Sequence, residues 1–169
     1  MRNFIIYLFI YIFATVVQFS WAKYFVIFGL FPNIILLILL FIGLTRGSTA
    51  GQLLGFSLGL TWDVLSVDLF GSHAFLCTVV GYLSGKLARK WDESKIATQV
   101  IIAGFASVFF WLGIDITRMI FGENAPGIRS DYIVIFQIFY NMLLAPIIFG
   151  IAKFIGYYFV NKETFDSFS

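Results

Sequence analysis

Six stretches of the chain carry no charged side chain and are long enough, or nearly so, to cross a lipid bilayer. A transmembrane helix needs about 20 predominantly apolar residues to span roughly 30 Å of hydrocarbon. Most of the charged residues lie in the short segments between these stretches. The pattern predicts six membrane-spanning helices joined by short loops. The charge-free stretches are Asn3–Ala22, Tyr24–Thr45, Gly47–Trp62, Leu69–Gly85, Ile96–Ile114 and Tyr132–Ala152.

Local signals refine where these helices begin and bend. Proline is tolerated in the first turn of a helix and breaks its interior, so the second helix is expected to begin at Pro32 and Asn33, after an interfacial lead-in at 24–31. Ser72 is a candidate N-cap for the fourth helix, and Pro146 is a candidate kink in the sixth. The predicted spans are about 4–21, 32–45, 48–65, 72–89, 96–121 and 131–160.

The composition agrees with an all-α integral membrane protein made of a single membrane domain, residues 1–169. Hydrophobic residues make up 60% of the chain and charged residues only 12%, about half the share of a soluble domain. The net charge of +2 provides no basic footprint for nucleic acid. The single cysteine, Cys77, excludes an intramolecular disulfide and a thiolate metal site. Function is therefore expected in the helices and their short loops.

The distribution of Lys and Arg predicts the orientation of the chain in the membrane. Cytoplasmic loops carry an excess of these residues. With both termini inside, eight of the eleven Lys and Arg residues lie on the cytoplasmic side, and the densest group, Lys86 to Lys95, would attract anionic lipid head groups. We therefore predict an N-in, C-in topology.

Glycine recurs at every fourth position over a long part of the chain. This spacing places small side chains on one face of a helix, where backbones can approach closely. The favoured interpretation is packing between helices of this protein, and the alternative is a groove that receives a helix of another protein. The glycines at this spacing are Gly43, Gly47, Gly51, Gly55 and Gly59, with Gly81 and Gly85 repeating it on the next helix.

A few polar residues fall inside the apolar stretches. Asp63 lies near the outer end of its helix, where a carboxylate usually has a partner or water. Arg118 lies at a comparable depth on the fifth helix, one turn after Asp115. For Asp63 a structural ion pair or solvated interface charge is favoured, while a ligand or proton site and a contact with a partner remain alternatives. Gln137 and Asn141 share a face of the sixth helix, which favours cross-linking of the core.

Catalytic and metal chemistry find little support in the sequence. Ser57 lies in a G-x-S-x-G pattern, but the glycine spacing produces that match, and the strand–turn–helix that the motif requires is not predicted. The only histidine, His73, is expected near the outer surface, away from Ser57. With a single imidazole and no carboxylate cluster near it, we expect no metal site, no cofactor and no enzymatic activity.

An ordered set of these motifs resembles the MreD family of bacterial rod shape-determining membrane proteins. The length and the six-span layout also agree with this family, although it commonly has aspartate where this chain has Asn33. The motifs are Pro32-Asn33, the glycines Gly51, Gly55 and Gly59, Leu60 before Asp63, the segment Leu69-Phe70-Gly71-Ser72-His73-Ala74, and Gly81-Tyr82-Leu83.

The resemblance implies a non-enzymatic scaffold or regulator of cell elongation and peptidoglycan synthesis in the bacterial inner membrane. Its expected partner is MreC, a single-span protein, and through it MreB filaments, RodA and a penicillin-binding transpeptidase. It also implies a helical arrangement similar to the substrate-binding subunits of energy-coupling-factor transporters. The alternative is such a subunit itself, with an outer small-molecule pocket near Trp62, Asp63 and His73.

Overall fold

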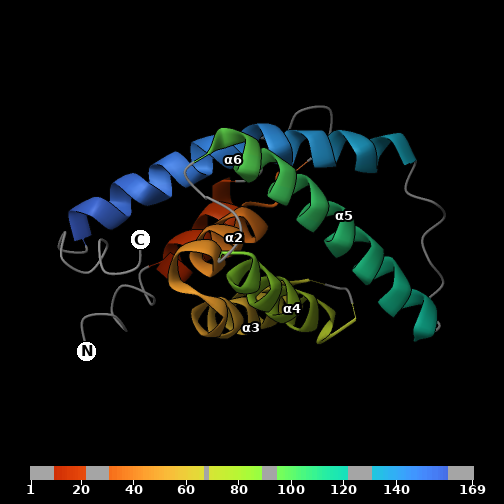
Figure 1. The fold of residues 1–169 in the computed structure, drawn as a ribbon. Coiled ribbons are helices and arrows are strands. Elements are labelled where there is room, and N and C mark those ends of the chain that lie inside the picture. Colours follow the sequence, from red (N-terminus) through yellow and green to blue (C-terminus); the bar gives the residue numbers. More distant parts are fainter. Residues whose placement is uncertain (1–9, 22–30, 67–68, 89–94, 122–130, 160–169) are drawn as a thin grey trace.

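The computed structural model describes residues 10–21, 31–66, 69–88, 95–121 and 131–159 (Figure 1). This part of the chain is helical and has no strand, which confirms the all-α prediction. Residues 10–16 are helical and continue into the π-helix η1. The elements are η1 (Val17–Trp21), α2 (Ile34–Arg46), α3 (Ser48–Leu65), α4 (Ser72–Leu87), α5 (Ile96–Ile120) and α6 (Asp131–Phe159).

Helix α2 forms the centre of the molecule. Every residue from Ile34 to Leu44 is buried, and α2 contacts η1, α3, α4, α5 and α6. Its sequence is apolar on all sides, as expected for a helix that has no exposed face. At 13 residues it is about 20 Å long, shorter than a bilayer core. Figure 1 shows α2 between the α3–α4 pair and the long helix α6.

Helices α3 and α4 form a hairpin in which the two backbones touch. A Cβ atom added at Gly55 would collide with the carbonyl group of Cys77, and one added at Gly81 would collide with the carbonyl group of Gly51. At Gly59 an added Cβ would lie 2.5 Å from the Cα atom of Ala74. Glycine is therefore the residue that permits this close approach.

Two further glycines of the repeat, Gly85 of α4 and Gly47, lie at the α2–α3 junction. A Cβ at Gly85 would collide with the backbone of Ser48, so this end of the hairpin is also closely packed. Gly47 differs from the expected helix-packing position: it lies in the turn with φ of +87°, and a Cβ on it would meet nothing. Its role here is conformational, because few other residues adopt a positive φ.

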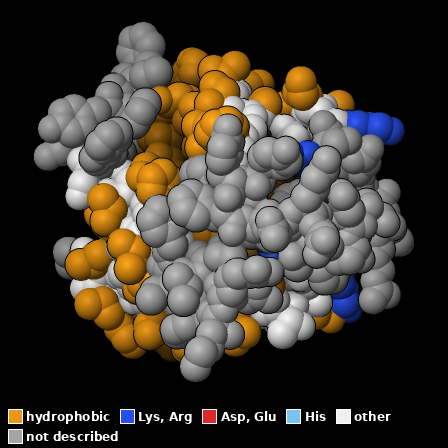
Figure 2. All heavy atoms as spheres, turned by 90° about the vertical axis from the view of Figure 1, so that its left-hand side faces the viewer, with side chains coloured by type: hydrophobic (Ala, Val, Ile, Leu, Met, Phe, Trp, Pro, Cys, Tyr) orange, Lys and Arg blue, Asp and Glu red, His pale blue; other side chains and the backbone are white. Residues whose placement is uncertain are grey.

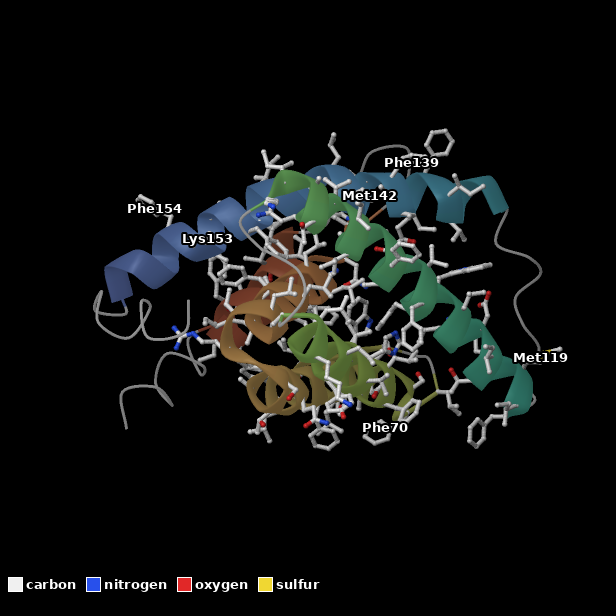
Figure 3. All side chains as sticks on the ribbon, viewed as in Figure 1. Phe70, Met119, Phe139, Met142, Lys153 and Phe154 are labelled. Carbon is white, nitrogen blue, oxygen red and sulfur yellow. The ribbon has the colours of Figure 1, made fainter. Side chains whose placement is uncertain are left out.

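Helices α5 and α6 pack against each other and expose broad apolar faces. α5 and residues Val134–Phe154 of α6 are both long and apolar enough to cross a membrane. Two further apolar helices, Ile10–Ser20 and Ile34–Arg46, are shorter. Pro146 lies inside α6. In Figure 3 the labelled side chains Phe139 and Phe154 of α6 and Met119 of α5 point away from the bundle.

Most of the described cations share one end of the bundle. Gly85 of α4 packs on Ser48, so the end of α4 lies beside the α2–α3 junction. α6 runs in the same direction as α2, because Asn141 bonds to Asn33 and Phe149 packs edge-to-face on Phe41 with ring centroids 5.4 Å apart. The four cations at this end are Arg46, Lys86, Lys95 and Lys153.

Figures 2 and 3 show parts of this arrangement. Figure 3 labels Lys153 toward one end of the molecule and Met119 at the other. Figure 2 views the molecule from its left-hand side in Figure 1, with the visible Lys and Arg side chains mostly on one side of the face and hydrophobic side chains mostly on the other.

Candidate functional site: polar clusters at two helix starts

The carboxylate of Asp63, at the end of α3, binds the start of α4. Its Oδ1 accepts the backbone N–H of His73 at 3.0 Å, and its Oδ2 accepts the backbone N–H of Ala74 at 2.9 Å. The imidazole Nδ1 of His73 lies 2.9 Å from the same Oδ1. This distance is that of a hydrogen bond between the imidazole and the carboxyl group.

This contact replaces a missing helix cap. The first N–H groups of a helix have no partner within the helix, and negative charge is stabilising near them. The N-cap of α4 is Gly71, with φ of +96°, which has no side chain to offer. The expectation that Ser72 is the N-cap is therefore wrong: its hydroxyl donates to the carbonyl of Leu69 at 2.7 Å, and Asp63 caps the helix from a neighbouring one.

Aromatic rings enclose the Asp63–His73 pair. The Trp62 ring stacks on the imidazole with centroids 4.9 Å apart and planes 11° apart, and Phe110 of α5 lies 5.9 Å from the same imidazole. Asp63 and His73 are 3% and 4% exposed. His73 is therefore buried inside the bundle, and its position near the outer membrane surface stays a prediction. Ser57 is exposed and donates to the carbonyl of Leu53, so it forms no dyad with His73.

Two charged residues of α5 lie close to each other. The guanidinium of Arg118 is 3.9 Å from the carboxylate of Asp115, one turn earlier on the same helix. The Asp115 side chain is about half exposed, so this ion pair contributes little to stability. The hydrogen-bond partners of Asp63 lie on α4. Arg118 has a similar depth because both residues lie near the same end of the bundle.

A second polar cluster surrounds the start of α2. Asn33 is its N-cap, and its side-chain oxygen accepts the N–H of Leu36 at 3.0 Å. The side-chain oxygen of Gln18, from η1, accepts the N–H of Ile34 at 2.8 Å. The side-chain oxygen of Asn141, from α6, accepts the N–H of Asn33 itself at 2.9 Å. Side chains from three parts of the chain thus satisfy the donors of a buried helix start.

The amide groups of this cluster are also bonded on their other side. Asn141 donates to the hydroxyl of Ser107 on α5 at 3.0 Å, and Gln18 donates to the carbonyl of Pro32 at 3.3 Å. Gln137 donates to the carbonyl of Phe31 at 3.1 Å. Asn141 is 2% exposed. The shared face of Gln137 and Asn141 on α6 is therefore directed at the chain segment that enters α2.

Two members of this cluster were not singled out from the sequence. Gln18 is the one amide within the described part of the first apolar stretch, residues 10–21, and that isolation is a usable signal. Ser107 gives no such signal, because small hydroxyl residues in membrane helices commonly bond to their own backbone.

The chemistry that this arrangement performs is structural. The oxygens of Asp63, Asn33, Gln18 and Asn141 are bonded to backbone N–H groups. Among the described residues, no three His, Cys, Asp or Glu side chains come together as a metal site would require. The two clusters hold helix starts in place inside an apolar bundle.

The bundle defines the class of this chain: a helical, membrane-associated protein whose buried polar groups serve its own backbone. The family model for the rod shape-determining protein MreD matches residues 1–159 of the 169-residue chain, so the chain belongs to the MreD family. The resemblance drawn from the motifs is confirmed, and with it a role in determining rod shape. No curated protein and no solved structure matches the chain.

Proposed function

We propose that the chain is a non-enzymatic scaffold or regulator of the bacterial cell-elongation complex and that it binds an MreC-like single-span protein. The observation that carries this proposal is the family match over residues 1–159. Through this partner the chain is connected to MreB, RodA and a penicillin-binding transpeptidase that act in peptidoglycan synthesis. The proposed location is the bacterial inner membrane.

The proposed topology has six spans with both termini in the cytoplasm. The positions of the cations support it, since Arg46, Lys86, Lys95 and Lys153 gather at one end of the bundle, while Arg118 lies at the other with Asp115. The end rich in Lys and Arg faces the cytoplasm by the positive-inside rule. The proposed likeness to substrate-binding subunits of energy-coupling-factor transporters rests on the family resemblance.

The surfaces available for docking support a scaffold. The interior polar groups described above are engaged in capping helix starts. The outward faces of α5 and α6 are mostly apolar, with Phe105, Met119 and Leu143 each more than two-thirds exposed. Such faces bind lipid or the transmembrane helix of another protein. The interfacial segment 24–31 and the outer loop 122–129 are further candidate contacts for a periplasmic domain. Residues 24–30 and 122–129 lie outside the described part of the chain.

The alternative, a small-molecule-binding transporter subunit, places its ligand near Trp62, Asp63 and His73. A binding pocket needs polar groups that converge on a ligand. In the structure both oxygens of Asp63 bond to α4, and the Trp62 ring covers one face of His73. The same residues that would form the pocket therefore hold the α3–α4 hairpin together.

Detergent co-purification beside a ligand screen tests the proposal. The full chain is purified from membranes together with a tagged MreC-like protein, and the isolated chain is screened against vitamin-type compounds by thermal shift. We expect a stable complex with the MreC-like protein and no stabilising compound. Stoichiometric binding of a vitamin-like ligand without the protein partner would overturn the scaffold and favour the transporter subunit.

A further inference from the structure

The outward face of α5 carries a regular seam of exposed side chains. Its members alternate in spacing between four and three residues, which is the spacing at which one helix packs along another in a left-handed pair. Each of these side chains is exposed in the structure, and all but one are apolar. The α5 seam consists of Ile101, Phe105, Val108, Leu112, Asp115 and Met119.

The helices that pack on α5 use its other faces. A Cβ added at Gly113 would meet the side chain of Leu76 on α4, and one added at Gly104 would lie 3.0 Å from the sulfur of Met142 on α6. Figure 1 shows that α5 runs away from α6 toward its C-terminal end. The exposure of the α5 seam therefore means that no helix in the described part of the chain covers it.

Asp115 places a carboxylate within this apolar seam. On the same face, Leu112 lies one turn before it and Met119 one turn after it, and both are exposed. Exposed apolar residues continue to Phe121, six residues or about 9 Å beyond Asp115. An ionised side chain inside an apolar membrane face is costly, and such residues usually pair with another polar or charged group.

The partner of Asp115 within its own helix is a weak one. The guanidinium of Arg118 lies 3.9 Å from its carboxylate, which is longer than a hydrogen bond. The Asp115 side chain is 47% exposed and that of Arg118 only 23%, so the carboxylate is the more accessible of the two. The carboxylate can therefore accept hydrogen bonds from a second molecule seated on the seam.

The charge of Asp115 decides which occupant fits the seam. Lipid tails offer no hydrogen-bond donor to a carboxylate. In a parallel pair of identical helices each seam position faces its own counterpart, so a second copy would bring Asp115 against Asp115 and two like charges together. A different helix that carries a cation at this depth satisfies both the apolar positions and the carboxylate.

We propose that the α5 seam is the docking surface for a single transmembrane helix of a partner protein, and that a Lys or Arg in the outer half of that helix pairs with Asp115. This inference rests on the proposed function, in which an MreC-like single-span protein binds the chain. The apolar seam residues supply the packing surface. Asp115 sets the register of the partner helix and excludes helices without a cation, as single polar positions do in coiled coils.

Charge reversal tests the pairing. The full chain is purified in detergent with a tagged MreC-like protein, and the amount of each protein recovered is compared. We expect Asp115→Lys to lower recovery of the partner about tenfold or more, because two cations then meet in the interface, while Asp115→Glu retains it. Asp115→Lys should keep the wild-type Tm, since the side chain is exposed. Recovery equal to the wild type would overturn the proposal.

A compensating change in the partner identifies the other half of the pair. Each Lys and Arg in the outer half of the partner's span is replaced by Glu in turn. We expect one of these variants to restore recovery with Asp115→Lys and to lose it with the unaltered chain. A partner in which none of them restores recovery would contradict the pairing with a cation.

Photo-cross-linking maps the surface itself. The cross-linking amino acid p-benzoylphenylalanine replaces Phe105 or Leu112 of the seam, and Phe75 on α4 serves as a control of comparable exposure to Phe105. We expect both seam positions to cross-link to the tagged partner and Phe75 not to. A cross-linked dimer of the chain would show that a second copy covers the seam. Seam positions that yield no cross-link to protein would show that lipid covers it, and either result overturns the proposal.

The unaltered chain separates this inference from the proposed function. If the wild-type chain does not co-purify with the MreC-like protein, the proposed function fails and the inference fails with it. If the wild type and Asp115→Lys both co-purify and the seam positions give no cross-link to the partner, the proposed function stands and only the docking surface is wrong.

Discussion

The α3–α4 hairpin and the surroundings of α2 are held together in different ways. The hairpin joins segments close in sequence through direct backbone contact at glycines, with one carboxylate, Asp63, capping α4 ten residues later. Around α2, neutral amides from η1 and α6 cap the helix start, and Asn141 bonds to Asn33 across 108 residues. The hairpin depends on the absence of side chains at its glycines. The start of α2 depends on hydrogen bonds that only the assembled bundle can supply.

The largest effect is expected from Gly55→Leu, which breaks the hairpin. The added side chain would collide with the backbone of Cys77, which has no flexible end to move aside. Overpacking of a close contact costs about 1–3 kcal/mol, and more where backbone must move. Gly150→Leu is the control, because a Cβ there meets nothing. Size-exclusion chromatography in detergent should show aggregation of the first variant alone; a monodisperse Gly55→Leu would contradict the packing.

The next largest effect is expected from Asp63→Leu, which removes the carboxylate cap. The N–H groups of His73 and Ala74 and the imidazole would lose their acceptor in a buried site. Each buried donor left without its acceptor costs about 1–3 kcal/mol, and three donors are affected. The Tm in detergent measures this loss. The exposed Asp115→Leu serves as a control and should change stability by less than about 1 kcal/mol.

A smaller loss is expected from Asn141→Leu, which breaks the amide cluster. The N–H of Asn33 and the hydroxyl of Ser107 each lose a partner. An unsatisfied buried group costs about 1–3 kcal/mol, although the apolar replacement recovers part of this through packing. Ser107→Ala should cost about 1 kcal/mol, and the double variant less than the sum, because the two residues share one bond. Additive losses in this cycle would contradict the network.

The smallest effect is expected from Gln137→Ala. Its hydrogen bond to the carbonyl of Phe31 lies in an exposed position, where water can replace the lost donor. We expect a change in stability of about 0.5 kcal/mol or less. A loss as large as that of Asn141→Leu would show that the capping cluster extends to Gln137.

The two regions also differ in how far the sequence predicts them. The glycine spacing and the Pro32-Asn33 pair are local signals, and they indicate a close helix contact and a helix start. The sequence indicates that Arg118 lies at a depth comparable to that of Asp63, but it does not indicate in which direction either side chain points. The cap on α4 depends on the turn at Gly71, whose positive φ returns α4 toward Asp63.

The polar cluster at the start of α2 could not be predicted from the sequence, for a physical reason. Gln18 and Asn141 belong to helices whose rotation about their axes is set by packing on α2, and apolar residues on all sides of α2 leave no pattern that specifies it. The sequence could indicate that Gln137 and Asn141 share a face. Only the assembled bundle shows that this face meets the start of α2.

The central claim is that the interior polar groups hold helix starts while function resides in docking. Asp63→Asn tests it most directly, because asparagine keeps the shape and one acceptor oxygen but removes the charge. In cells lacking the native gene, we predict that a variant shown by Tm to be folded still co-purifies with the MreC-like protein and restores rod shape. A folded Asp63→Asn protein that leaves the cells round would contradict the account and indicate a charge-dependent or proton-linked site.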